Sequence, residues 1–176
     1  MQETISVCKR LRPGESVIGK QGLQYAVGIS AESVGAKAIH MQLLTIPPGG
    51  RAFVHKHATH ETAIYAQSGT SHVWHGERLE NHSIVRPGDF FYIPADIPHL
   101  PYNPSDTEPV TAIIARTDPN EQESVILLPE LEGIHPPTPK QKLILFVQRA
   151  DYEACEDIGE HNGSNPGKFV FMDPDK

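Results

Sequence analysis

The chain has 176 residues, of which 38% are hydrophobic and 21% charged, and its formal net charge is −7. That length is enough for one domain with a real core and too short for two ordinary domains. Because the acidic balance comes without any Lys/Arg-rich run, it argues against nucleic acid and an anionic membrane surface as partners.

Short β-type runs follow one another from about residue 16 to residue 116. Pro and Gly, with 16 and 14 copies, separate many of these runs as turn signals. The runs are SVIGKQGLQYAVGIS, AIHMQLLTI, RAFVHKH, ETAIYAQ, SHVWHG, SIVRPGD, DFFYIPA and PVTAIIART. Seven or eight strands with turns between them predict a sandwich or barrel of antiparallel strands.

The C-terminal third has a different character. Prolines in residues 117–141 forbid long helices and indicate a connection that follows the surface. Beyond it, LILFVQ has the length of a strand, RADYEACEDIGEH could form a short helix, and GKFVFMD could form a last strand. Because an apolar strand outside the barrel must be buried, LILFVQ is expected to join the sheet edge or to cover a neighbouring subunit, and we expect a homodimer.

Cys8 and Cys155 lie far apart and in no CxxC arrangement, which indicates neither a disulfide framework nor a thiolate metal site. No apolar run has the length of a signal peptide core or a membrane span. We therefore expect a cytoplasmic protein.

Eight of the ten histidines fall between residues 40 and 99. His55 and His57 are two residues apart in a strand-like run, so both imidazoles should point to the same face, which in a barrel is the interior. Glu61 follows at an even offset after a short corner. The sequence therefore predicts that Glu61, Ala63, Tyr65 and Gln67 share the inner face.

Two spaced motifs make a resemblance specific. Gly49-(x5)-His55-x-His57-(x3)-Glu61-(x7)-Gly69 resembles the first motif of the cupin superfamily. After a gap of 18 residues, Gly88-(x5)-Pro94-x-Asp96-(x2)-His99-(x3)-Asn103 resembles the second.

The resemblance implies an all-β fold, the cupin double-stranded β-helix or jelly-roll barrel, of the small bacterial, RmlC-like type. On this interpretation residues 1–176 form a single cupin domain, with a barrel core at about 16–116 and a C-terminal extension at 117–176. The resemblance also implies that His55, His57, Glu61 and His99 hold one divalent metal.

The sequence departs from the family pattern at two positions. The first motif normally leaves six residues between its glutamate and its glycine, whereas seven separate Glu61 from Gly69, so the corner or the hairpin holds an extra residue and His60 becomes a competing ligand. Asp96 stands where the second motif normally has glycine, at a turn position that often needs φ > 0. Asp tolerates that conformation better than most residues.

Three imidazoles and one carboxylate suit Fe, Mn, Co, Ni, Cu or Zn as the divalent metal. We expect a metal-dependent enzyme of the dioxygenase, isomerase or lyase type that acts on a small oxygenated organic substrate. The alternative is a binding or sensory cupin that takes up a small ligand without turnover. Tyr65 and Gln67 are candidates for substrate binding, although strand aromatics and amides, Trp74 and Phe91 included, more often pack in the core. His72 and His75 are expected to be ordinary strand residues, or one of them a hydrogen-bond donor to a ligand.

Overall fold

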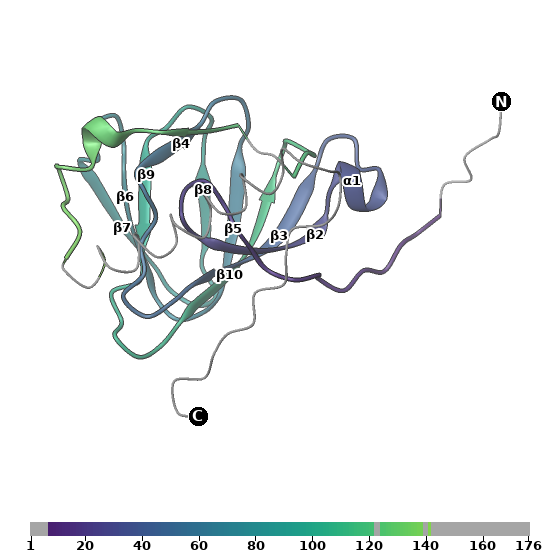
Figure 1. Ribbon diagram of the computed structural model, residues 1–176, viewed down its shortest axis with the longest axis horizontal. Helices are drawn as coiled ribbons and strands as arrows, with labels where there is room; N and C mark the ends of the chain where they lie inside the picture. The colour runs from purple at the N-terminus through teal and green to yellow at the C-terminus, as the bar shows by residue number, and fades with distance from the viewer. Residues whose placement is uncertain (1–6, 122–123, 139–140, 142–176) are drawn as a thin grey trace, which may run out of the picture.

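The computed structural model describes residues 7–121, 124–138 and 141 (Figure 1). Nearly all regular structure in these residues is β. In chain order the elements are β1 (Val17–Ile18), β2 (Gln24–Ile29), α1 (Ala31–Val34), β3 (His40–Ile46), β4 (His55–His57), β5 (Thr62–Ser68), β6 (Ser71–His75), β7 (Asn81–Val85), β8 (Phe90–Ile93), β9 (His99–Tyr102), β10 (Val110–Arg116), β11 (Val125–Leu127) and the 3-10 helix η1 (Pro129–Leu131). Within the described ranges, no helix has the length and apolar character that crossing a membrane requires.

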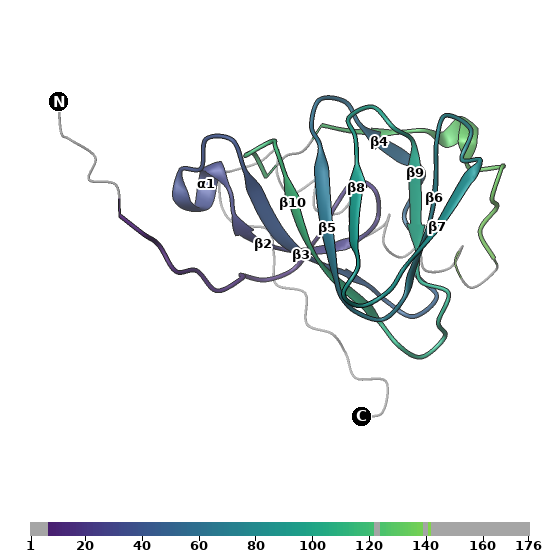
Figure 2. The same ribbon diagram turned by 180° about the vertical axis from the view of Figure 1, so that it is seen from behind.

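Two antiparallel sheets form the barrel. The larger sheet has the order β1-β2-β3-β10-β5-β8, and the smaller has the order β11-β4-β9-β6-β7. Figures 1 and 2 show the two sheets facing each other, with α1 at one end beside β2. The predicted all-β jelly-roll is confirmed.

The inner face of the larger sheet follows from alternating burial. Strand β3 (HMQLLTI) buries every second residue, and β10 (VTAIIAR) does the same. Leu44 pairs with Ala112, and Ile46 with Val110, so these side chains share one face and pack with Leu23 in the main apolar cluster. Most members of this cluster also line the cavity described below.

The turns of both motifs have left-handed backbone. Gly69 lies at φ +69°, and a Cβ there would collide with the Pro109 carbonyl, so the position requires glycine. Asp96 lies at φ 65°, as expected for a residue that replaces glycine in a turn. Its carboxylate also contacts the Lys56 ammonium at 2.7 Å.

The described part of the C-terminal segment packs against the barrel. Strand β11 pairs with β4, and beyond it the Glu132 carboxylate accepts hydrogen bonds of 2.6 Å from both the buried Arg51 guanidinium and the Val54 backbone N–H. The segment thus extends the sheet that carries His55 and His57. The runs LILFVQ, RADYEACEDIGEH and GKFVFMD lie outside the described residues.

Candidate metal centre

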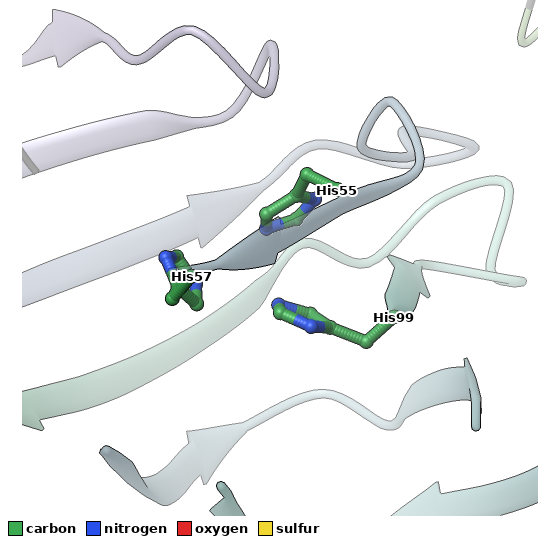
Figure 3. A group of neighbouring side chains, drawn as sticks. All are labelled: His55, His57 and His99. Carbon is green, nitrogen blue, oxygen red and sulfur yellow. The ribbon is translucent and has the colours of Figure 1, made fainter. Parts of the chain in front are cut away.

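Three histidines meet inside the barrel. His55 begins β4 and His57 ends it, and His99, which begins β9, pairs directly with His55 across the sheet. One ring nitrogen of each lies within 4.8 Å of those of the other two, and the three side chains are almost completely buried. Figure 3 shows the rings gathered around a common space. They are positioned to hold a metal ion.

Backbone hydrogen bonds orient two of these rings. His55 Nδ1 lies 2.7 Å from the Phe53 carbonyl oxygen, and His99 Nδ1 lies 2.8 Å from the Ile97 carbonyl oxygen. Because a carbonyl only accepts, each Nδ1 carries the proton and donates it. The lone pair of each ring is therefore on Nε2, the tautomer that a metal ligand needs, so this donor set fits a divalent transition metal.

Burial keeps the three imidazoles uncharged. Removal from water lowers the pKa of His99 to about 4, and it lowers the pKa of His55 well below 6.5, with a further contribution from the neighbouring His99. The pKa of His57 is lowered by the same burial and by His55 and His99. All three are neutral near pH 7, so no proton competes with a metal.

The three histidines open on a cavity between the sheets. Its volume is about 720 Å³, including the part open to solvent. Apolar side chains from both sheets form most of its lining, among them Leu44, Ile64, Val73, Phe91 and Ile114. The described lining residues include no Asp, Glu, Lys or Arg.

The structure does not bring Glu61 to the three histidines. Its side chain is exposed, and its carboxylate accepts a hydrogen bond of 2.6 Å from the Tyr92 hydroxyl on the outer face of the larger sheet. Thr62, the next residue, is buried and lines the cavity. The four-residue corner at 58–61 changes which residues face inward, so the even offset from His57 does not predict the face of Glu61.

The same change of face affects Tyr65 and Gln67. Tyr65 is 38% exposed and its ring lies 5.0 Å from that of Phe90, while Gln67 is also exposed. The inner residues of β5 are Thr62, Ile64 and Ala66. The expectation that Tyr65 and Gln67 face the cavity is therefore wrong.

Family comparison agrees with this geometry. The model of the family described as Cupin domain matches residues 42–115, which contain all three histidines. Residues 42–115 form a cupin domain. No curated protein matches the chain significantly.

Solved structures share the cupin fold with this chain. The polyketide cyclase RemF from Streptomyces resistomycificus is 18% identical, with a TM-score of 0.59 over 77% of this chain and 97% of that one. A Cupin 2 conserved barrel domain protein from Salinispora arenicola is 18% identical, with a TM-score of 0.53 over 64% and 91%. The oxalate decarboxylase of Lactobacillus farciminis is 20% identical, with a TM-score of 0.54 over 89% of this chain but only 39% of that chain.

The cupin motif now explains the extra residue before Gly69. Thr62, not Glu61, leaves the usual six residues before Gly69 and faces the cavity. The extra residue therefore lies in the corner before β5, and this cupin domain has a hydroxyl where the motif has a carboxylate. The Thr62 Oγ1 has no hydrogen-bond partner among the described residues.

His60, in the same corner, is buried beside the three histidines without joining them. Its ring centroid lies 4.5 Å from that of His57, and its Nδ1 is 3.2 Å from the Ser124 hydroxyl. It is not among the residues whose ligand atoms come within 4.8 Å of one another. His60 therefore lies beside the metal centre and outside the group of three ligand-type histidines.

Sequence reasoning missed the polar residues of the cavity wall. Gln21, Tyr25 and Gln42 line the cavity, and the Gln21 amide donates to the Tyr25 hydroxyl. One signal could have revealed Gln42, because it alternates with Leu44 and Ile46 on the inner face of the run HMQLLTI. Gln21 precedes β2 in a loop, where no periodicity marks its direction.

Proposed function

We propose that this protein is a metal-dependent enzyme whose His55, His57 and His99 bind one divalent transition metal. The proposed substrate is a small, mainly apolar organic molecule that carries an ionisable oxygen, such as a phenol or an enolisable ketone. The observation that carries the proposal is a cavity whose described lining contains three uncharged imidazoles and no Asp, Glu, Lys or Arg.

The ligand set selects the charge of the substrate. A divalent metal held by neutral imidazoles alone keeps its full double charge and supplies Lewis-acid stabilisation to an oxyanion. The described lining offers no Lys or Arg to a second negative group, so a dianion such as a dicarboxylate is poorly matched to this cavity. A molecule with one ionisable oxygen and an apolar body fits better.

Side chains of the cavity wall would orient the proposed substrate. Ile64, Phe91 and Ile114 exclude water from the apolar body of the substrate, which strengthens the polar contacts made inside. Gln42, on the same inner face, offers an amide donor and an amide acceptor to a second oxygen of the substrate.

A second candidate function is binding without turnover. The described lining contains no carboxylate and no lysine, so apart from the histidines and Tyr25 it has no group suited to proton transfer. Such a cavity could hold an oxygen-bearing ligand on the metal and leave it unchanged. Assays of binding and of product formation separate the two candidates.

The test starts with elemental analysis of the purified protein. We expect close to one equivalent of a transition metal in the wild type, bound at the centre formed by His55, His57 and His99, which is called the inner centre below. His57→Ala should lose most of this metal and keep the circular dichroism spectrum of the wild type. The loaded protein is then incubated with small phenols and enolisable ketones, and mass spectrometry follows product formation. Product that depends on the metal and on His57 supports the enzyme, and saturable binding without product supports the second candidate. Full metal content in His57→Ala would overturn both.

We also propose that the protein is a homodimer formed through the outer face of the larger sheet. Leu43, Ile113, Tyr65 and Phe90 lie in one cross-strand row on that face, and Phe90 is 82% exposed. Sedimentation equilibrium should give twice the chain mass for the wild type and the monomer mass for Phe90→Asp. Ile84→Asp, on the other sheet, is the control and should remain dimeric. A monomeric wild type would contradict the proposal.

A further inference from the structure

A second group of ligand-type side chains lies on the outer face of the smaller sheet. Strands β9, β6 and β7 are neighbours there (Figure 1). Ser71 and Val73 of β6 line the cavity, so His72 and Trp74 point outward by strand alternation. His82 of β7 pairs with Trp74, and Tyr102 of β9 pairs with His72. These four side chains share one face, opposite to the face that the cavity occupies.

Two imidazoles converge on one phenol in this group. His72 Nδ1 lies 3.2 Å from the Tyr102 hydroxyl oxygen, and His82 Nε2 lies 3.3 Å from the same oxygen. The His72 and His82 rings are 5.0 Å apart between centroids. A phenol has one proton and can donate to only one of the two nitrogens. At least one of the two imidazoles must therefore donate its own N–H to the Tyr102 hydroxyl oxygen.

The spacing of these atoms matches a coordination sphere. When metal–nitrogen and metal–oxygen bonds are about 2.0–2.2 Å, adjacent ligand atoms in a tetrahedral or square arrangement lie about 2.8–3.6 Å apart. The two nitrogen–oxygen distances fall in that interval. His82 is exposed and His72 and Tyr102 are half-buried, so an ion can reach the group from solvent. Because all three residues are on paired strands, little ordering is needed on binding.

We infer that His72, His82 and Tyr102 form a second, outer metal site, which takes a late divalent transition metal and binds Cu(II) most tightly. Two imidazole nitrogens and a phenolate oxygen suit Cu(II), which also stands highest in the general order of affinity for such ligands, and the phenol proton passes to solvent when the metal binds. Burial raises the pKa of Tyr102, so the loss of this proton opposes binding. Arg86 acts electrostatically on His72, and this positive charge opposes the binding of a cation. The outer site is therefore weaker than a site surrounded by carboxylates.

Trp74 provides a direct reporter of the outer site. It is the single tryptophan of the chain, and its ring centroid lies 4.3 Å from that of His82. Because Cu(II) is paramagnetic and quenches nearby indole fluorescence, a Cu(II) titration at pH 7.5 should quench the emission of Trp74 with a saturable dependence. His57→Ala, which removes a ligand of the inner centre, should keep this quenching.

Three variants test the ligand assignment. His82→Gln and Tyr102→Phe should each raise the Cu(II) concentration needed for half-maximal quenching by about tenfold or more, since even partners outside a ligand set change metal affinity by that much. His135→Gln is the matched control, because His135 stacks on Trp74 at 3.8 Å but is not a proposed ligand. It should quench at the wild-type concentration of Cu(II).

The opposite results overturn the inference. Wild-type half-saturation in His82→Gln would show that the copper sits elsewhere, and an equal loss in His135→Gln would assign the quenching to a different histidine. The circular dichroism spectrum of each variant establishes that it is folded. Tyr102→Phe keeps the aromatic ring in place, so it isolates the loss of the hydroxyl. A charge-transfer absorption in the visible that is present in the copper-loaded wild type and absent from Tyr102→Phe would identify the phenol as a ligand.

Discussion

Glu61 and Thr62 are neighbours in the sequence and face opposite sides of the larger sheet. The carboxylate of Glu61 bonds to Tyr92 outside, while the hydroxyl of Thr62 is buried at the cavity. A carboxylate ligand from Glu61 would lower the net charge of the metal centre, whereas the neutral hydroxyl of Thr62 leaves that net charge unchanged. Which of the two faces inward therefore decides the electrostatics of the centre.

Two separate substitutions test whether position 62, and not position 61, faces the metal. Thr62→Glu brings a negative charge to three neutral imidazoles, so metal affinity should rise by about tenfold or more, measured by competition with a chromophoric chelator. Thr62 Oγ1 has no hydrogen-bond partner among the described residues, so the replacement breaks no such bond. Glu61→Gln, the matched variant on the outer face, should leave metal affinity unchanged. Loss of affinity in Glu61→Gln would instead restore Glu61 as a ligand.

His40 makes stability depend on pH. It is completely buried opposite Arg116, and burial together with that positive charge lowers its pKa to about 4. The unfolded chain takes up this proton near pH 6.5 and the folded chain does not, so the free energy of unfolding should fall as the pH drops from 6.5 to 4. Urea unfolding of the metal-free protein at pH 7.5 and pH 5 measures the change. His40→Gln should show a smaller drop, and an equal drop would contradict this role of His40.

Single residues show where sequence reasoning succeeds at the site. The shared face of His55 and His57 follows from strand alternation, and the approach of His99 follows from the resemblance to the two motifs, because all three residues lie on regular strands. Glu61, Tyr65 and Gln67 follow an irregular corner, where the backbone can gain or lose one residue without breaking any periodic pattern. One residue more or fewer in that corner moves every side chain of the following strand to the opposite face of the sheet.

Among the elements, β11 and η1 are the hardest to predict from the sequence. Residues 117–141 read as a surface connection because proline is frequent, yet Val125–Leu127 adds a strand beside β4. Nothing local in VIL distinguishes a three-residue edge strand from a loop, since its backbone partner is about 70 residues earlier in the chain. The strands of 16–116 are easier, because apolar runs alternate there with Gly and Pro turns.

Glu132 ties this segment to β4 and provides a test at the scale of elements. Its carboxylate bonds to the buried Arg51 and to the Val54 N–H, so Glu132→Ala leaves a buried charge and a backbone donor without this partner. We expect a loss of about 1–3 kcal/mol in the free energy of unfolding, measured with urea. Glu130→Ala, an exposed change on η1, should cost less than about 0.5 kcal/mol. Equal effects of the two substitutions would show that the Arg51 contact contributes little.

At the scale of the whole molecule, the inner centre joins parts of the chain that are distant in sequence. His55 and His57 come from one strand and His99 from another, more than 40 residues later. The unfolded chain holds these imidazoles apart and binds a metal only weakly. Metal binding and folding are therefore coupled, because an ion that binds the folded barrel alone shifts the equilibrium toward it.

This coupling predicts how much a metal stabilises the fold. Added to metal-free protein at about one hundred times its dissociation constant, Zn(II) should raise the free energy of unfolding by about 2.7 kcal/mol for one site. His57→Ala should lose the greater part of that gain, whereas His82→Gln, which leaves the three inner histidines intact, should keep it. Urea unfolding with and without Zn(II) gives the three values. If His57→Ala gained as much as the wild type, the stabilising ion would not be bound at His55, His57 and His99, and the cavity would have to be interpreted without a metal.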